Sequence, residues 1–408
     1  MGDLHRVLLL SGIIAFLLAL GSFRRSCGIA RLLQALAPHT APVSTPLPSV
    51  SVLAPCCGVD PAFEVYARAL LSQDYPHYEI LFLVESTADP AWAVLHRILA
   101  ATPEANASLL TVGAAEGCSQ KIHNLRVGLA HVAAETTVLA LVDSDAQVHA
   151  QWLRALVKPL DALTIGAASG FRWYVPWRGS LASSLRSAWN AATLGLMVHP
   201  RFGFAWGGSS AIRRELFDKL GIGELWSRGL SDDLLLTRAV RAAGLRIAFV
   251  AAGLVPTYEP CTWRQLLEWT NRQATIGRIY APRSWCISLL VHLTKILLGL
   301  LVLLALTTGQ WLAGGFLMSY CLLNGLGSMV VCRAAVRCLV MSGFAVQQSP
   351  WVQALWGPMV TLLVLVNMAV SLTRRTITWR GLTYTMLSPQ HTVVHRGRGA
   401  PAPSSHPS

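Results

Sequence analysis

"TVLALVDSDAQV", residues 137–148, runs a short apolar stretch directly into two acids that flank a serine. A brief run of β-branched and aliphatic residues is typical of a strand buried inside a sheet. The pattern therefore predicts that Asp143 and Asp145 lie at the carboxyl end of a buried strand. In open sheets with parallel strands, ligands bind at that end.

The segments before this strand alternate between strand and helix. Strands are expected at "VSVLAP", "YEILFLVE" and "SLLTV", and helices at residues 61–72, at "ADPAWAVLHRILAA" and at "QKIHNLRVGLAHVAA". Apolar strands that alternate with helices predict an α/β fold whose mainly parallel sheet is covered on both faces. Glu85 also falls at the carboxyl end of its strand.

The composition points to a lipid environment. The 408 residues are 53% hydrophobic and 13% charged, whereas a soluble domain has about 25% charged residues. Residues 7–20 form an apolar N-terminal segment, expected to be an uncleaved anchor. Three long apolar runs at residues 287–306, 311–331 and 351–372 predict three membrane helices. Residues 332–348 contain Arg333 and Arg337 and are expected at the membrane interface.

The net charge of +13 does not indicate nucleic acid, because the basic residues form no dense run and no alternation with aromatics. They flank the apolar segments instead, with Arg24 and Arg25 after the first and Arg374 and Arg375 after the last. This places the N-terminus outside and the sheet domain in the cytoplasm of a multi-pass membrane protein. A bacterial inner membrane is expected. Three spans after that domain leave the last arginines outside, against the same rule.

The expected domains follow from these segments: an anchor (1–25), a basic and Pro-rich linker (26–49), a catalytic domain (50–262), an interfacial amphipathic helix (263–286), membrane helices (287–373), and an interfacial segment with a disordered tail (374–408).

Two acidic pairs are candidates for the site. Asp143 and Asp145 offer hard oxygen ligands that suit Mg²⁺ or Mn²⁺, although aspartate is also a common helix N-cap. Asp232 and Asp233 open a helix for which Ser231 can serve as the N-cap, so both need not be structural. Asp89 precedes a proline, which is equally consistent with a cap.

Several motifs, taken in order, resemble the ceramide glucosyltransferase branch of the family 2 glycosyltransferases. They are "GVDPAF", "QDYPHYEILFLVESTADPA", "QKIHNL", "LVDSDAQV", "VHPRFGF", "GGSSAIRR" and "LSDDLLLTRA"; the later "TWRGLTYTM" also resembles a segment of membrane-bound members. The resemblance covers residues 50–282. It implies a GT-A fold, a UDP-sugar donor, a membrane-lipid acceptor, and an inverting transfer that makes a β-linked glycolipid.

The resemblance also implies roles for individual residues. Asp233 matches the catalytic base, His199 matches a histidine tied to activity in this branch, and Asp143 and Asp145 match the metal and diphosphate motif. Asp232, next to Asp233, is also expected to be catalytic. The residues expected to bind the nucleotide sugar are Glu85, Asp89, Lys121, Asn124, Asp143, Gln265, Trp269 and Arg272. Lys121 and Asn124 could also be the solvent face of a helix, and the catalytic candidate His199 could also be an ordinary loop histidine.

One position departs from the family. The signature (Q/R)-x-x-R-W reads Q-L-L-E-W here, with Glu268 in place of the arginine. A carboxylate cannot replace a cation beside a diphosphate, so either Arg272 takes that role or the site differs.

Three other functions stay open. A processive polysaccharide synthase uses similar aspartates, a polyprenyl-phosphate sugar transferase has a phosphate acceptor, and a scaffold protein binds nucleotide sugars without turnover. The set of carboxylates itself favours glycosyl transfer. A bound metal stabilises the departing diphosphate, and a carboxylate such as Asp233 can accept the proton of the attacking hydroxyl.

Overall fold

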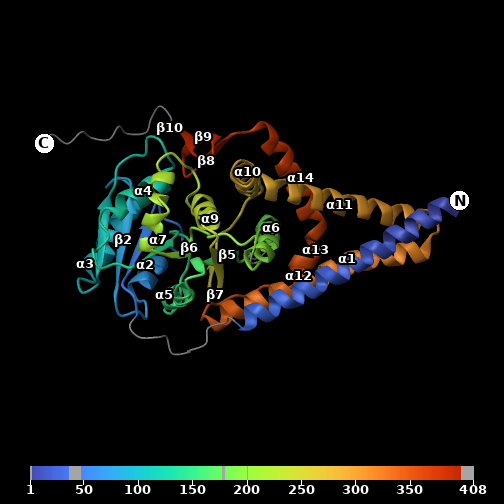
Figure 1. Ribbon diagram of the computed structural model, residues 1–408, viewed down its shortest axis with the longest axis horizontal. Helices are drawn as coiled ribbons and strands as arrows, with labels where there is room; N and C mark the ends of the chain where they lie inside the picture. The colour runs from blue at the N-terminus through green and yellow to red at the C-terminus, as the bar shows by residue number, and fades with distance from the viewer. Residues whose placement is uncertain (1, 36–46, 177–179, 200, 397–408) are drawn as a thin grey trace.

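The computed structural model describes residues 2–35, 47–176, 180–199 and 201–396. A sheet domain lies at one end, and long helices extend from it to the other end, where the N-terminus lies (Figure 1). A small second sheet, formed by residues 376–395, lies above the sheet domain in this view (Figure 1). The expected linker falls largely in residues 36–46, outside the described residues.

The described residues of the sheet domain form a mixed seven-stranded sheet with the order β3-β2-β1-β4-β6-β5-β7. Its strands are β1 (Val50–Pro55), β2 (Tyr78–Val84), β3 (Ala107–Thr111), β4 (Val138–Val142), β5 (Ile165–Tyr174), β6 (Ser209–Arg213) and β7 (Arg246–Thr257). The first four are mutually parallel, β5 and β7 are parallel, and β6 is antiparallel to both of its neighbours. The prediction of a mainly parallel sheet is confirmed.

Helices cover both faces of this sheet. They are α2 (Phe63–Leu71), α3 (Pro90–Ala100), α4 (Gln120–Leu129), α5 (Trp152–Val157), the short 3₁₀ helix η1 (Lys158–Asp161), α6 (Leu181–Met197), α7 (Arg214–Lys219), α8 (Ile222–Leu225) and α9 (Asp232–Ala242). Alternate residues of a strand point to opposite faces. In β2, Phe82 belongs to one buried core while Leu81 and Leu83 belong to the other. Two-sided burial explains why the strands are apolar throughout.

The remaining helices are α1 (Gly2–Ala35), α10 (Trp263–Tyr280), α11 (Pro282–Thr307), α12 (Trp311–Met341), α13 (Trp351–Leu355) and α14 (Gly357–Thr373). Within the described ranges, three of them, α1, α11 and α12, are long and apolar enough to cross a membrane. α1 lies along α12 (Figure 1), and the Ser22 hydroxyl donates to Asn324 at 3.0 Å.

The structure corrects two boundaries in these segments. α1 continues past residue 25 to Ala35, because Ala30 and Leu33 are buried in a core shared with α12 and β7. The segment after residue 332, expected at the interface, continues α12 to Met341. It packs on the sheet domain, where the Cys338 thiol donates to the Ala251 carbonyl at 3.3 Å.

Of the three membrane helices predicted after residue 287, two within the described residues, α11 and α12, are long and apolar enough to cross a membrane. The last apolar run breaks at Trp356 and leaves α14 with 17 residues. A helix of that length spans about 25 Å, at the lower limit for crossing a bilayer core of roughly 30 Å. α14 packs on α10, where the Asn367 amide donates to Thr270 at 3.0 Å and to Asn271 at 2.8 Å.

The C-terminal region is the largest departure from expectation. Residues expected to form an interfacial segment build a three-stranded antiparallel sheet of β8 (Thr376–Trp379), β9 (Leu382–Ser388) and β10 (His391–His395). Its Ile377, Tyr384 and Met386 are buried against Leu230 of the sheet domain. Residues 397–408 lie outside the described residues.

Candidate active site

The carboxyl ends of β2 and β4 bring together several of the predicted residues. Glu85 follows β2 and Asp143 follows β4, as expected from the sequence. Asp232 and Asp233 occupy the first turn of α9, whose N-cap is Ser231. The N-terminus of α4, capped by Ser119, places Lys121 between the two groups of acids. This edge of the sheet is therefore the candidate site.

Lys121 connects the two acidic pairs. Its ammonium lies 2.8 Å from Oδ1 of Asp143 and 3.0 Å from Oδ2 of Asp232. All three side chains are largely buried. Burial works against the charge on Lys121, but the two carboxylates outweigh it and raise its pKa. The Lys121 ammonium is thus a fixed charge at the centre of the site.

Arg172 of β5 is a residue that the sequence analysis missed. Its guanidinium bonds Asp143 at 3.0 Å and Asp145 at 2.6 and 2.7 Å, and it donates to the Tyr174 hydroxyl at 3.0 Å. It also lies 5.0 Å from the Trp206 ring centroid, within reach of a cation–π contact. The available signal was an arginine inside a strand of buried residues, because a buried arginine requires an acidic partner.

The acids of the site differ in their protonation. Burial opposes the charge on Asp143, yet Lys121 and Arg172 hold its pKa below the usual range. Burial raises the pKa of Asp232 to about 6, with Asp233 and Asp143 adding to the effect while Lys121 opposes it. Burial also raises the pKa of Asp233. Near neutral pH the α9 acids are therefore easier to protonate than Asp143.

Asp233 is the more accessible of the two α9 acids. Its Oδ1 accepts hydrogen bonds from the Ser231 hydroxyl and, at 2.7 Å, from the Leu234 amide. Within the described part of the chain, its Oδ2 accepts none. Asp232 is only 3% exposed and is tied to Lys121. The geometry leaves Asp233 as the acid with an oxygen available to a substrate.

A separate acidic cluster surrounds Asp145. One carboxylate oxygen from each of Asp60, Asp145 and Glu259 lies within 4.8 Å of the other two. Three hard oxygen donors in this space fit a divalent cation such as Mg²⁺ or Mn²⁺. Asp143, predicted as a metal ligand together with Asp145, is instead joined to it through Arg172.

Two glycines let the backbone approach these side chains. A Cβ on Gly207 would lie 2.1 Å from Oδ2 of Asp232 and 2.8 Å from the Lys121 ammonium. A Cβ on Gly208 would lie 2.2 Å from the Trp206 ring. Both positions therefore require glycine, so the "GG" dipeptide is part of the site rather than only a turn.

The predicted signature residues on α10 divide into two groups. Gln265 is exposed and forms a capping box with Thr262, and Glu268 points to solvent and pairs with Arg264 at 2.7 Å. Trp269 and Arg272 face the site. The Trp269 ring lies 5.3 Å from that of Tyr174, and Arg272 lies 5.5 Å from the Trp379 ring centroid.

Three other predicted residues have local roles. Asp89 caps α3 and accepts from the Ala91 amide at 2.8 Å and from the Gly58 amide at 2.9 Å. Asn124 is 2% exposed and donates to the Leu83 carbonyl at 2.9 Å.

His199 is exposed and packs on Phe202, with ring centroids 4.7 Å apart. Among the described residues, none of these three contacts the acids joined by Lys121 and Arg172.

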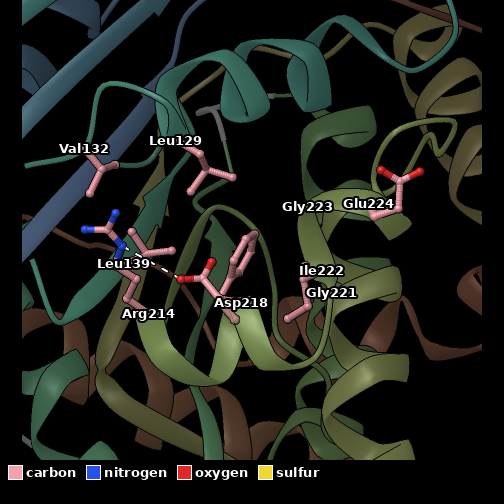
Figure 2. A pocket seen from close by; sticks show the side chains of 10 residues that line it. Leu129, Val132, Leu139, Arg214, Asp218, Gly221, Ile222, Gly223 and Glu224 are labelled. Atoms are coloured by element: carbon pink, nitrogen blue, oxygen red, sulfur yellow. Dashed lines mark ion pairs between the residues drawn. The ribbon is translucent and has the colours of Figure 1, made fainter. Parts of the chain in front are cut away.

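One cavity does not coincide with this site. It holds about 300 Å³ between α4, α7 and α8. Figure 2 shows its apolar wall, with Leu129 and Ile222, and the ion pair of Arg214 with Asp218 at its rim. It contains none of the acids described above, so we do not assign the chemistry to it.

The sequence matches glycosyl transferase family 21 over residues 6–391. It is 30% identical over 135 residues to a ceramide glucosyltransferase of Komagataella phaffii, a match that covers 32% of this chain and 26% of that relative. The match thus spans about a quarter of the relative's length.

Two solved structures have a partly similar fold. One is a mannosyltransferase of Pyrobaculum calidifontis in complex with GDP-mannose and Mn²⁺ (TM-score 0.48, 18% identity, 90% of this chain and 97% of that one). The other is glucosyl-3-phosphoglycerate synthase of Mycobacterium tuberculosis with Mn²⁺ and UDP-glucose (TM-score 0.37, 18% identity, 61% and 82%).

Proposed function

We propose that this chain, which belongs to glycosyl transferase family 21, transfers a sugar from a nucleotide sugar to the hydroxyl group of a membrane lipid. UDP-glucose is the expected donor and ceramide the expected acceptor. The transfer inverts the anomeric carbon, so an α-linked donor gives a β-linked glycolipid. Family membership makes the chain a glycosyltransferase, and the choice of acceptor rests on the following observation.

The acidic site is continuous with an apolar helix that can enter the membrane. Arg172 binds Asp145 and donates to Tyr174, and the Tyr174 ring packs against Trp269 of α10. One residue separates α10 from α11. A lipid whose hydroxyl reaches Asp233 therefore has an apolar surface close by for its chains, which supports a lipid acceptor over a soluble one.

Each charged side chain of the site has a distinct role in the proposed reaction. The acceptor oxygen attacks the anomeric carbon as its proton passes to Asp233, while the bond from that carbon to the nucleoside diphosphate breaks. The raised pKa of Asp233 brings it closer to neutrality and so improves it as a proton acceptor. Lys121 and Arg172 hold Asp143 and Asp232 in place and provide positive charge beside the leaving diphosphate.

A divalent cation fits the cluster of Asp60, Asp145 and Glu259. When bound, it supplies a Lewis acid that stabilises the charge on the departing diphosphate. We assign it to this cluster, with Asp145 as the ligand shared with the predicted Asp143/Asp145 motif.

The contacts of the C-terminal sheet suggest a topology. Since β8–β10 pack on the sheet domain, both lie on one side of the membrane. Crossings by α1, α11 and α12 alone satisfy this condition, with the N-terminus on the opposite side. The segment with Arg374 and Arg375 then lies on the cytoplasmic side, as the positive-inside rule requires. The conflict found in the sequence disappears once α14 is not counted as a span.

The test is transfer of label from radioactive UDP-sugars into extracted lipid, with purified protein in vesicles that contain ceramide or diacylglycerol. We expect labelled glycolipid with Mn²⁺ or Mg²⁺, and none after EDTA. NMR of the product gives the linkage. A water-soluble labelled polymer would indicate polysaccharide synthesis instead, and donor binding without any product would indicate a binding protein.

Arg272 is expected to take the place of the signature arginine. Arg272→Ala should raise the KM for the donor by about tenfold, as for loss of a charge-assisted hydrogen bond, whereas Glu268→Gln should leave it unchanged. Donor titrations of both variants check this. Equal effects of the two substitutions would mean that Arg272 does not contact the donor.

A further inference from the structure

The hairpin that joins β8 to β9 has an unusual backbone. Trp379 pairs with Leu382, so Arg380 and Gly381 form a two-residue turn, with φ of 47° and 80°. Positive φ at both central residues defines a type I′ turn, which favours Asn-Gly. Arg380 is the one non-glycine residue with positive φ in the described part of the chain. A non-glycine residue with positive φ costs conformational free energy, and such residues cluster at functional sites, so Arg380 is a candidate for a functional role.

The Arg380 side chain reaches the acidic cluster from the far end of the chain. Its guanidinium forms two parallel hydrogen bonds with the Asp60 carboxylate, at 3.0 and 2.6 Å. Asp60 is in turn grouped with Asp145 and Glu259. Arg272 stacks on Trp379, the residue before Arg380. Guanidinium groups from β5, α10 and the hairpin thus gather around Asp145 and its neighbours.

We propose that Arg380 is a donor-binding residue that contacts the diphosphate, so that the β8–β9 hairpin forms one wall of the nucleotide-sugar site. This inference rests on the proposed function. An arginine has five N–H donors, and two are used on Asp60, which leaves three for phosphate oxygens. The planar fork that fits a carboxylate also fits a phosphate. The Arg380 side chain keeps 38% of its surface exposed, so a ligand can reach it.

The surrounding contacts keep the hairpin in position for this role. The Tyr384 hydroxyl accepts from the Gln120 amide at 3.3 Å, next to Lys121, and the Thr392 amide donates to the Arg228 carbonyl at 2.9 Å, just before the α9 acids. Arg396 pairs with Glu85 at 2.6 Å. The C-terminal sheet therefore contacts the segments that carry Lys121, Asp232 and Glu85.

The test is Arg380→Asn in the full-length protein, since asparagine suits the turn and lacks the guanidinium. Binding of UDP and of uridine is measured by competition, with EDTA and separately with Mn²⁺. We expect UDP affinity to fall by about tenfold in both conditions, with uridine affinity and melting temperature unchanged. Arg264→Asn, at an exposed arginine that also pairs with an acid, is the matched control and should change nothing.

Each other result would overturn the inference. Unchanged UDP affinity would show that Arg380 does not touch the diphosphate. A loss seen only with Mn²⁺ would mean that Arg380 acts through Asp60 and the cation. An equal loss for UDP and uridine together with a lower melting temperature would mean that the hairpin is only structural. A wild type that transfers sugar from UDP-glucose in any of these cases leaves the proposed function intact, whereas a wild type that binds no UDP refutes both.

Discussion

Asp233→Asn is expected to lower the turnover number by about a thousandfold, within the range for loss of a general base. The amide cannot accept the proton of the attacking hydroxyl, yet it keeps the shape of the side chain and the hydrogen bonds from Ser231 and Leu234. The KM for the donor should change little. The measurement is label transferred from the UDP-sugar to lipid per minute, at saturating donor.

Asp218→Asn is the matched control, because Asp218 is an exposed aspartate on α7 that lies outside the acidic site. It should retain full activity. If Asp233→Asn also stayed active, the acceptor would not need a strong base. A polyprenyl phosphate would then be a better acceptor than a lipid hydroxyl.

Lys121→Met is expected to lower the free energy of unfolding by about 3 kcal/mol at pH 8, as for a buried ion pair that loses one partner. Asp143 keeps Arg172, but Asp232 is left buried and charged without its cation. The Lys121→Met variant should also lose activity. Melting temperatures of the detergent-solubilised protein between pH 5 and pH 8 provide the measurement.

The loss of unfolding free energy in Lys121→Met should become smaller as the pH falls. The pKa of Asp232 in the folded protein, about 6, lies above its usual value, so folding is favoured when this acid is protonated and loses that contribution as the pH rises through 6. Without Lys121, which opposes the rise, protonation persists to still higher pH. Lys219→Met, at an exposed lysine, should show no such trend. A deficit that is equal at pH 5 and pH 8 would contradict the ion-pair explanation.

The sheet domain was predictable because its signals are local. Four apolar strands separated by helices stand at the predicted segments, and the acids at the ends of β2 and β4 follow from the strand limits. The linkage between Asp143 and Asp232 through Lys121 was not predictable, because it depends on how α4 is placed between β4 and α9. The contacts of Arg172 with the acids were not predicted for the same reason, since Asp145 and Asp143 lie 27 and 29 positions earlier in the chain.

The C-terminal half was harder to predict because hydropathy measures only composition. It could not show that residues 332–341 continue α12 against β7, or that the last apolar run breaks at Trp356 and leaves α14 with 17 residues. The segment "TWRGLTYTM" was recognised as a family motif, but its hairpin and the pairing of Arg380 with Asp60 are long-range features. The sequence signal for them was an arginine at a turn position that normally carries asparagine.

The late position of β8–β10 in the chain has a consequence for biosynthesis. The strands β8–β10 leave the ribosome after α11 and α12, since a chain is synthesised from its N-terminus. The sheet domain can fold early, but the segments beside Lys121 and Asp232 gain their last contacts only when Tyr384 and Thr392 arrive. Nascent chains that end before residue 384 therefore lack these last contacts beside Lys121 and Asp232.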